Sequence, residues 1–183
     1  MVSSGVTAQH RQSDSLILTP ENRVFEKPAV FPRDFVGHWI GFLEWSQVGK
    51  TKSKPIIMSL DIKPSKDTAG QYTWHLTYGD SAKDSRSYIL KPIDSAKGHW
   101  VIDELNGIIL DQYWNANRLT GAFTVQKSTI VNSYWIEKSD LYIEFISYSS
   151  KPIATTGKGD IETPFVDSYE IKSFQRAVLN KIK

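Results

Sequence analysis

The chain has 183 residues, enough for one domain with a sizeable core, and 40% of them are hydrophobic and 23% charged, as in an ordinary globular protein. A formal net charge of +2 is too balanced to indicate a nucleic-acid partner or an anionic membrane surface, and no apolar stretch reaches the length that a membrane span needs. The sequence contains no cysteine, which excludes a disulfide framework, thiolate metal sites and thiol catalysis. Aromatic residues make up 12% of the chain and favour β structure or an aromatic-lined cavity.

Residues 1–33 differ in composition from the rest of the chain and predict an irregular N-terminal arm ahead of a single domain at 34–183. The small, polar segment Val6-Thr7-Ala8, followed by Gln9, has the pattern of a signal-peptidase site, although no basic and apolar segments precede it. This pattern leaves two interpretations. The arm is either a flexible leader of a cytoplasmic protein or the remnant of a clipped signal peptide on a periplasmic or secreted one.

From residue 34 onward, runs of about 8–12 residues alternate apolar and polar positions between turn residues, as in β-strands. The predicted strands are 37–48, 55–63, 70–78, 86–93, 98–105, 108–114, 119–127, 129–137, 141–149 and 167–179. Asn106-Gly107 is a strong hairpin pattern, 157–160 predicts a longer loop, and only 176–183 is compatible with a short helical end. Sequential strands without helical crossovers predict an all-β fold, a single antiparallel up-and-down β-barrel of about 8–10 strands.

Gly37-His38-Trp39 resembles the G-x-W signature that opens the first strand of lipocalins and related calycin barrels. Phe35-Val36 leads into it after an irregular arm, as in that family. The resemblance implies a lipocalin-like barrel in which Arg176, on the last strand, packs across the Trp39 ring and helps to close the barrel bottom. The helix that lipocalins carry after the eighth strand is not visible, so the ten-stranded fatty-acid-binding and nitrobindin-like barrels fit the strand count equally well.

A closed barrel of this size can enclose one small ligand, and the strand alternation predicts which side chains face it if Trp39 points inward. The predicted ligand-binding residues are Trp39, Trp45, Tyr72, Trp74, Tyr78, Trp100, Glu104, Gln112, Trp114, Phe145 and Arg176. The expected ligand is a small apolar molecule such as a fatty acid or polyene, and Arg176 would pair with its carboxylate if it were not engaged by Trp39. The alternative is a solid core filled by the same aromatic side chains.

Catalytic and metal-binding patterns are missing from the sequence, so we predict no catalytic residue, metal or cofactor and expect a binding protein rather than an enzyme. Two alternatives remain open beside a binding role. A barrel enzyme of the isomerase or cyclase type would need an interior carboxylate, for which Glu104, Asp111 and Glu144 are candidates, and an extracytoplasmic interaction module would need only a filled core. His75 or His99 could also serve as an axial haem ligand, as in nitrobindin-like barrels.

Overall fold

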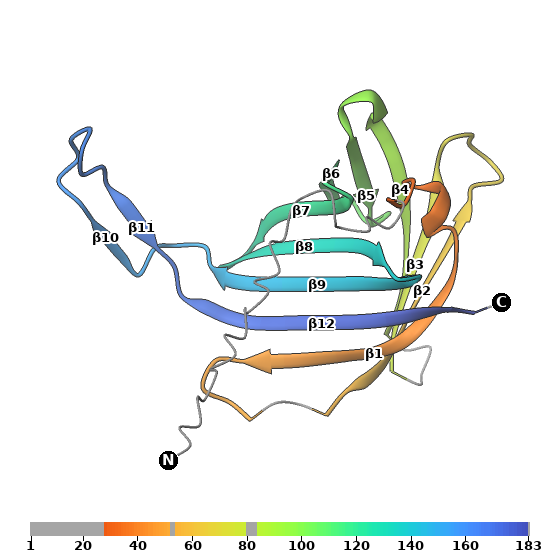
Figure 1. Cartoon of the computed structure of the whole chain (residues 1–183), viewed down its shortest axis with the longest axis horizontal. Coiled ribbons are helices and arrows are strands. Elements are labelled where there is room, and N and C mark those ends of the chain that lie inside the picture. The colour runs from red at the N-terminus through yellow and green to blue at the C-terminus, as the bar shows by residue number, and fades with distance from the viewer. Residues whose placement is uncertain (1–27, 52–53, 80–83, 183) are drawn as a thin grey trace, which may run out of the picture.

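The computed structural model describes residues 28–51, 54–79 and 84–182, and over these residues the chain forms a closed barrel of ten antiparallel strands (Figure 1). The barrel strands are β1 (Gly37–Gln47), β2 (Ile56–Pro64), β3 (Tyr72–Tyr78), β4 (Ser85–Asp94), β5 (His99–Asp103), β6 (Ile109–Asn115), β7 (Arg118–Val125), β8 (Ser128–Glu137), β9 (Asp140–Ser149) and β12 (Ile171–Ile182). Each strand pairs with its neighbours in the chain, and β1 pairs with both β2 and β12, which closes the barrel. The predicted all-β, up-and-down barrel is confirmed.

Among the described residues, helix occurs only as short 3-10 turns, namely η2 (Arg33–Phe35), η4 (Ser95–Lys97) and the single position Asp84. Within the same ranges no helix is both long and apolar enough to cross a bilayer. The segment Val6-Thr7-Ala8 lies outside the described residues.

The alternation that predicted the strands also assigns their two faces. On β3, Trp74 and Leu76 are buried inside the barrel while His75, between them, faces outward. The same alternation on the other strands builds one continuous core. Its buried members include Leu43, Met58, Leu60, Ile62, Leu90, Ile102, Leu119, Leu141, Ile143, Ala177 and Leu179.

The end of the barrel at which β1 begins is closed by the residues that precede β1. Phe31 stacks on Trp114 with ring centroids 4.9 Å apart and meets Trp100 edge-on at 5.1 Å. Phe35 is fully buried, and its carbonyl oxygen accepts a hydrogen bond of 2.8 Å from the indole nitrogen of Trp39. We call these five side chains the aromatic plug. They fill the closed end and leave little room for a ligand there.

The C-terminal part of the chain differs from the sequence prediction in two ways. A two-stranded hairpin of β10 (Ala154–Thr156) and β11 (Val166–Ser168) stands away from the barrel between β9 and β12 (Figure 1), where the prediction was a loop followed by a last strand that begins at residue 167. The short helical end with which 176–183 is compatible does not form, because β12 continues to Ile182 and pairs with β1 as far as the Ile182–His38 pair. Ala177 and Leu179 alternate into the core, as a strand requires and a helix does not.

The predicted contact of Arg176 with Trp39 is also wrong. The register pairs Trp39 with Lys181, whereas Arg176 is opposite Glu44, five residues farther along each strand. Since Ala177 faces inward, Arg176 faces outward, where its guanidinium lies 5.6 Å from the Tyr142 ring and 3.8 Å from a Glu144 oxygen. The basic group over the Trp39 ring is Lys181, whose Nζ is 5.0 Å from the ring centroid.

Candidate functional site

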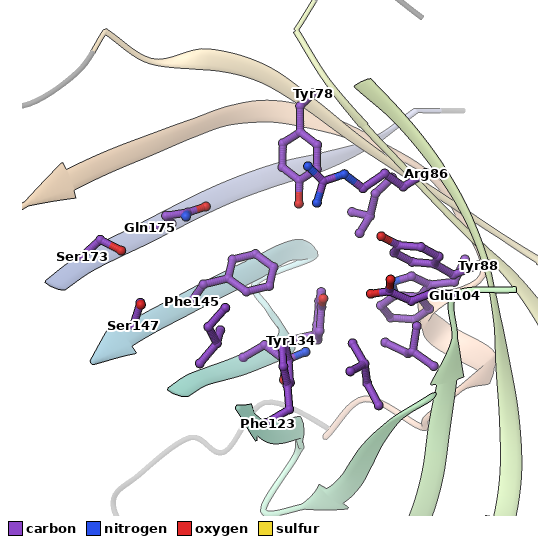
Figure 2. Close-up of a pocket in the computed structure, with 16 residues that line it drawn as sticks. Tyr78, Arg86, Tyr88, Glu104, Phe123, Tyr134, Phe145, Ser147, Ser173 and Gln175 are labelled. Carbon is purple, nitrogen blue, oxygen red and sulfur yellow. The ribbon is translucent and has the colours of Figure 1, made fainter. Parts of the chain in front are cut away.

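A cavity of about 240 Å³ lies inside the barrel at the end opposite the aromatic plug (Figure 2). Its walls are formed by the apolar side chains Leu76, Ile102, Leu110, Phe123, Ile130 and Phe145. Its polar lining groups are Trp74, Tyr78, Arg86, Tyr88, Glu104, Asn132, Tyr134, Ser147, Ser173 and Gln175. A lining that combines apolar walls with polar groups is found in small-molecule binding sites.

The cavity exists because the inward-facing side chains become smaller or more polar toward the open end. On β9 the inward positions are Leu141 and Ile143, both fully buried, and then Phe145 and Ser147. Serine supplies too little volume to fill the barrel cross-section that leucine fills nearer the plug. The barrel is therefore packed solid at one end and hollow at the other.

Charged and hydroxyl groups gather at the mouth of the cavity, which we define by Tyr78, Arg86, Glu104 and Gln175. The Arg86 guanidinium lies 4.8 Å from the Tyr78 ring centroid, and its Nε is 3.0 Å from Asp84 Oδ1. Figure 2 shows Tyr78 beside Arg86, Tyr88 beside Glu104, and Gln175 on the far side of the cavity from Glu104. The mouth can thus hydrogen-bond or pair with a polar end of a bound molecule.

Burial controls the titration of the tyrosines that line the cavity. It raises the pKa of Tyr78 to about 12, and the nearby Arg86 charge acts in the opposite direction. Burial also raises the pKa of Tyr88, and the Glu104 carboxylate adds to that rise. Both hydroxyls therefore stay protonated, as hydrogen-bond donors, at neutral pH.

The inner end of the cavity, which we call the floor, is made by Trp74, Asn132 and Tyr134. The Trp74 and Tyr134 rings meet edge-on at 5.0 Å, and all three side chains are at most 2% exposed. Trp74 Nε1 and Asn132 Oδ1 have no hydrogen-bond partner within the described part of the protein. Burial raises the pKa of Tyr134 well above its usual range, and the closeness of its hydroxyl to the hydrogen-bonding groups of Asn132 and Trp74 acts more weakly in the opposite direction, so the floor is uncharged.

The structure brings four of the predicted ligand-binding residues together around the cavity, namely Trp74, Tyr78, Glu104 and Phe145. The others lie elsewhere. Three of them, Trp39, Trp100 and Trp114, belong to the aromatic plug. Tyr72 packs against the core, and Gln112 is fully buried. Trp45 is 43% exposed beside the mouth, and Arg176 is on the outer face.

Sequence reasoning missed Arg86, which is the arginine that lines the cavity. Its position follows from strand pairing, because Leu76 faces inward and Arg86 is directly opposite Leu76 on β4. Arg86, Tyr88 and Leu90 lie on the same face of β4, and Leu90 is buried. The alternation of this strand could therefore have predicted that Arg86 faces inward. Arginine is rare at inward positions, so the residue type itself gave no reason to place Arg86 at the cavity.

The histidines and two of the candidate carboxylates lie outside the cavity. His75 sits between Ser85 Oγ at 2.7 Å and Ser87 Oγ at 2.8 Å on the outer face. His99 Nε2 is 2.7 Å from Asp111 Oδ1, and its ring stacks on Tyr113. Neither histidine faces the interior, so their placement does not support an axial haem ligand. In the described ranges no three His, Asp or Glu side chains cluster in a way that could hold a metal ion.

The class that this fold and cavity define is a closed antiparallel β-barrel with an internal cavity open at one end. No family model and no curated protein matches the chain. Among solved structures it is similar to a protein of unknown function from the DUF3598 family of Nostoc punctiforme, with a TM-score of 0.57 and 11% sequence identity over 85% of this chain. The match spans 51% of that protein, so this chain corresponds to about half of its length. At this identity the likeness shows the barrel fold alone.

Proposed function

We propose that the protein binds one small, largely apolar molecule inside the barrel. The observation that carries this proposal is the cavity itself, in which apolar side chains form much of the wall and the charged side chains are confined to the mouth. The same fold without a function in binding would be expected to fill this space, as it does at the aromatic plug.

The dimensions of the cavity bound the ligand. A volume of about 240 Å³ is slightly below the range of about 300–1,000 Å³ that is usual for ligand pockets, so the enclosed part of a ligand is small. Trp74 on the floor and Tyr78 at the mouth are four residues apart on β3, which corresponds to about 13 Å at the usual strand rise. These dimensions favour a compact or short molecule, and a long-chain fatty acid or polyene would extend through the mouth.

A lipocalin-like relationship is part of the proposal and is supported by the start of β1. Gly37-His38-Trp39 opens this strand, and Trp39 lies at the closed end with a basic residue of the last strand over its ring. That residue is Lys181 in place of the expected Arg176. The tryptophan of the G-x-W signature therefore packs against a basic residue of the last strand, as the resemblance implies, but this residue is Lys181.

A cavity-blocking variant tests the binding proposal. Ser147→Phe places a large ring in the cavity, while Ile146→Phe adds the same ring to the outer face of the same strand. We expect 2-naphthol, measured by isothermal titration calorimetry, to bind to the unmodified protein and to Ile146→Phe, and to bind Ser147→Phe at least about tenfold more weakly. Equal affinities in all three proteins, or no heat of binding in any, would contradict a cavity site.

Glu104 keeps the enzymatic alternative testable. Of the three candidate carboxylates, Glu104 lines the cavity, whereas Asp111 and Glu144 pair with His99 and Arg176 on the outer face. An enzyme would convert a co-purifying ligand and lose this conversion in Glu104→Gln while still binding it. If mass spectrometry recovers the ligand unchanged after incubation with the unmodified protein, the result contradicts the enzymatic alternative and favours the binding function.

A further inference from the structure

The floor of the cavity holds polar atoms that are deeply buried and unpaired. Trp74 is fully buried and Asn132 is 2% exposed, and both residues line the cavity. The indole N–H of Trp74 and Asn132 Oδ1 each lack a hydrogen bond of good geometry within the described residues, although the Tyr134 hydroxyl lies near both side chains. A buried polar atom without a partner is destabilising, so such atoms are retained where a further group can bond to them.

Space for this arrangement comes from a glycine on the neighbouring strand. Gly121 of β7 is directly opposite Asn132 of β8, and a Cβ at this position would collide with the amides of both Asn132 and Gln112. The missing side chain lets these two amides approach each other beneath the cavity. Gln112 does not line the cavity, and both polar atoms of its side chain also lack a hydrogen-bond partner within the described residues.

We propose, building on the binding function above, that the ligand enters with its polar end first and places an uncharged hydrogen-bonding group, such as a hydroxyl, against Trp74 Nε1 and Asn132 Oδ1. A hydroxyl can accept from the indole N–H and donate to the amide oxygen at the same time. The apolar body of the ligand then lies between Ile130, Phe145 and Phe123, below the mouth.

The distribution of charge in the cavity favours this orientation over one with an anionic group on the floor. Among the described residues that line the cavity, the charged ones are Arg86 and Glu104, and both belong to the mouth. An ion on the floor would lose its hydration without gaining an opposite charge. Arg86 in turn is already engaged with Asp84 and with the Tyr78 ring.

Three bicyclic probes of similar size test the proposal: naphthalene, 2-naphthol and 2-naphthoate. We expect 2-naphthol to bind about tenfold more tightly than naphthalene, because its hydroxyl pairs two buried groups that naphthalene leaves unpaired. We expect the ionised 2-naphthoate to bind more weakly than 2-naphthol. Isothermal titration calorimetry or competition measurements give the three affinities for the full chain.

Variants of the floor locate the effect. In Asn132→Leu, and separately in Trp74→Phe, the preference for 2-naphthol over naphthalene should fall to about twofold or less. Val131→Leu, which changes the outward-facing neighbour of Asn132, should keep the preference of the unmodified protein. The affinities for 2-naphthol and naphthalene are compared within the same variant, so a moderate loss of stability affects both and leaves their ratio unchanged. If one floor variant fails to fold, the other provides the test.

Each outcome of the probe series has a distinct meaning. Equal binding of naphthalene and 2-naphthol would overturn the inference about the floor and leave the proposed binding function intact. Tightest binding of 2-naphthoate, lost in Arg86→Gln, would also overturn it by placing the polar end of the ligand at the mouth. No binding of any probe would count against the binding function and the inference together.

Discussion

The hydroxyl of Tyr78 lies where the apolar wall of the cavity meets the charged side chains of the mouth. Burial raises its pKa to about 12, against the opposing influence of the Arg86 guanidinium beside its ring. The folded protein therefore holds the Tyr78 proton more tightly than the unfolded chain, in which a tyrosine titrates near 10. A difference of this kind makes stability depend on pH.

The stability that the neutral Tyr78 hydroxyl contributes is complete below about pH 10 and is lost as the pH rises toward about 12. Tyr78→Phe has no proton to release there, so its free energy of unfolding should fall less steeply across this interval. Between about pH 10 and pH 12, we expect the free energy of unfolding to decrease by on the order of 1–3 kcal/mol more in the unmodified protein than in Tyr78→Phe. Urea unfolding at a series of alkaline pH values measures it.

A second tyrosine variant serves as the control for the alkaline measurement. Tyr113→Phe removes a hydroxyl from an exposed ring of the outer face, which is 51% exposed. It should retain the pH dependence of the unmodified protein. Parallel curves for Tyr78→Phe and the unmodified protein would mean that Tyr78 does not cause the alkaline loss of stability.

At the scale of single elements, the segment around η2 fixes the closed end of the barrel. Phe35 packs edge-on against Phe31 at 5.1 Å and against Trp114 at 5.7 Å, and its carbonyl group holds the Trp39 indole. The segment is short and irregular, but its side chains complete the core that the first strand begins. A residue outside the sheet is thus part of the barrel interior.

Truncation of Phe35 should destabilise the whole protein. Phe35→Ala removes a fully buried ring and leaves a cavity, with an expected loss of about 3–5 kcal/mol in the free energy of unfolding. Phe165→Ala, in the chain just before β11 and 68% exposed, should change it by less than about 0.5 kcal/mol. Thermal or denaturant unfolding compares the two, and similar small losses for both would show that the plug does not support the barrel.

The sequence was sufficient for the elements that carry an alternating pattern and insufficient for those that do not. Every barrel strand was predicted near its observed position, because one face of each strand is buried and the other is not. The residues of β10 and β11 are all exposed, so no burial pattern marked the hairpin. Arg176 was assigned to the wrong contact because the alternation of apolar and polar residues does not determine the pairing register, which sets the residue opposite Trp39.

At the scale of the whole molecule, packing differs between the two ends of the barrel. Trp39, Leu141 and Leu179 fill the end near the plug, whereas Ser147 and Ser173 face the cavity. Whether an interior is solid or hollow depends on the summed volumes of inward side chains from all strands. That sum requires the register and could not be obtained from the sequence, which left a filled core and a cavity as alternatives.

This difference in packing predicts a gradient of local stability along the barrel axis. Backbone amides near the plug, such as those of Leu141 and Leu179, should exchange hydrogen more slowly than those of Ser147 and Ser173 on the same strands, by at least about tenfold. Hydrogen exchange followed by NMR gives the rates residue by residue. A uniform rate along β9 and β12 would show that the cavity does not weaken its surroundings.

Pairing of β1 with β12 joins the first and last strands of the barrel, with Trp39 opposite Lys181. During synthesis, β1 lacks its second partner until β12 has left the ribosome. A chain that lacks β12 presents two unpaired edges, on β1 and on β9, and such edges can pair with those of another unfinished chain. The 12 residues of β12 therefore decide between a closed barrel and strand-to-strand aggregation of nascent chains.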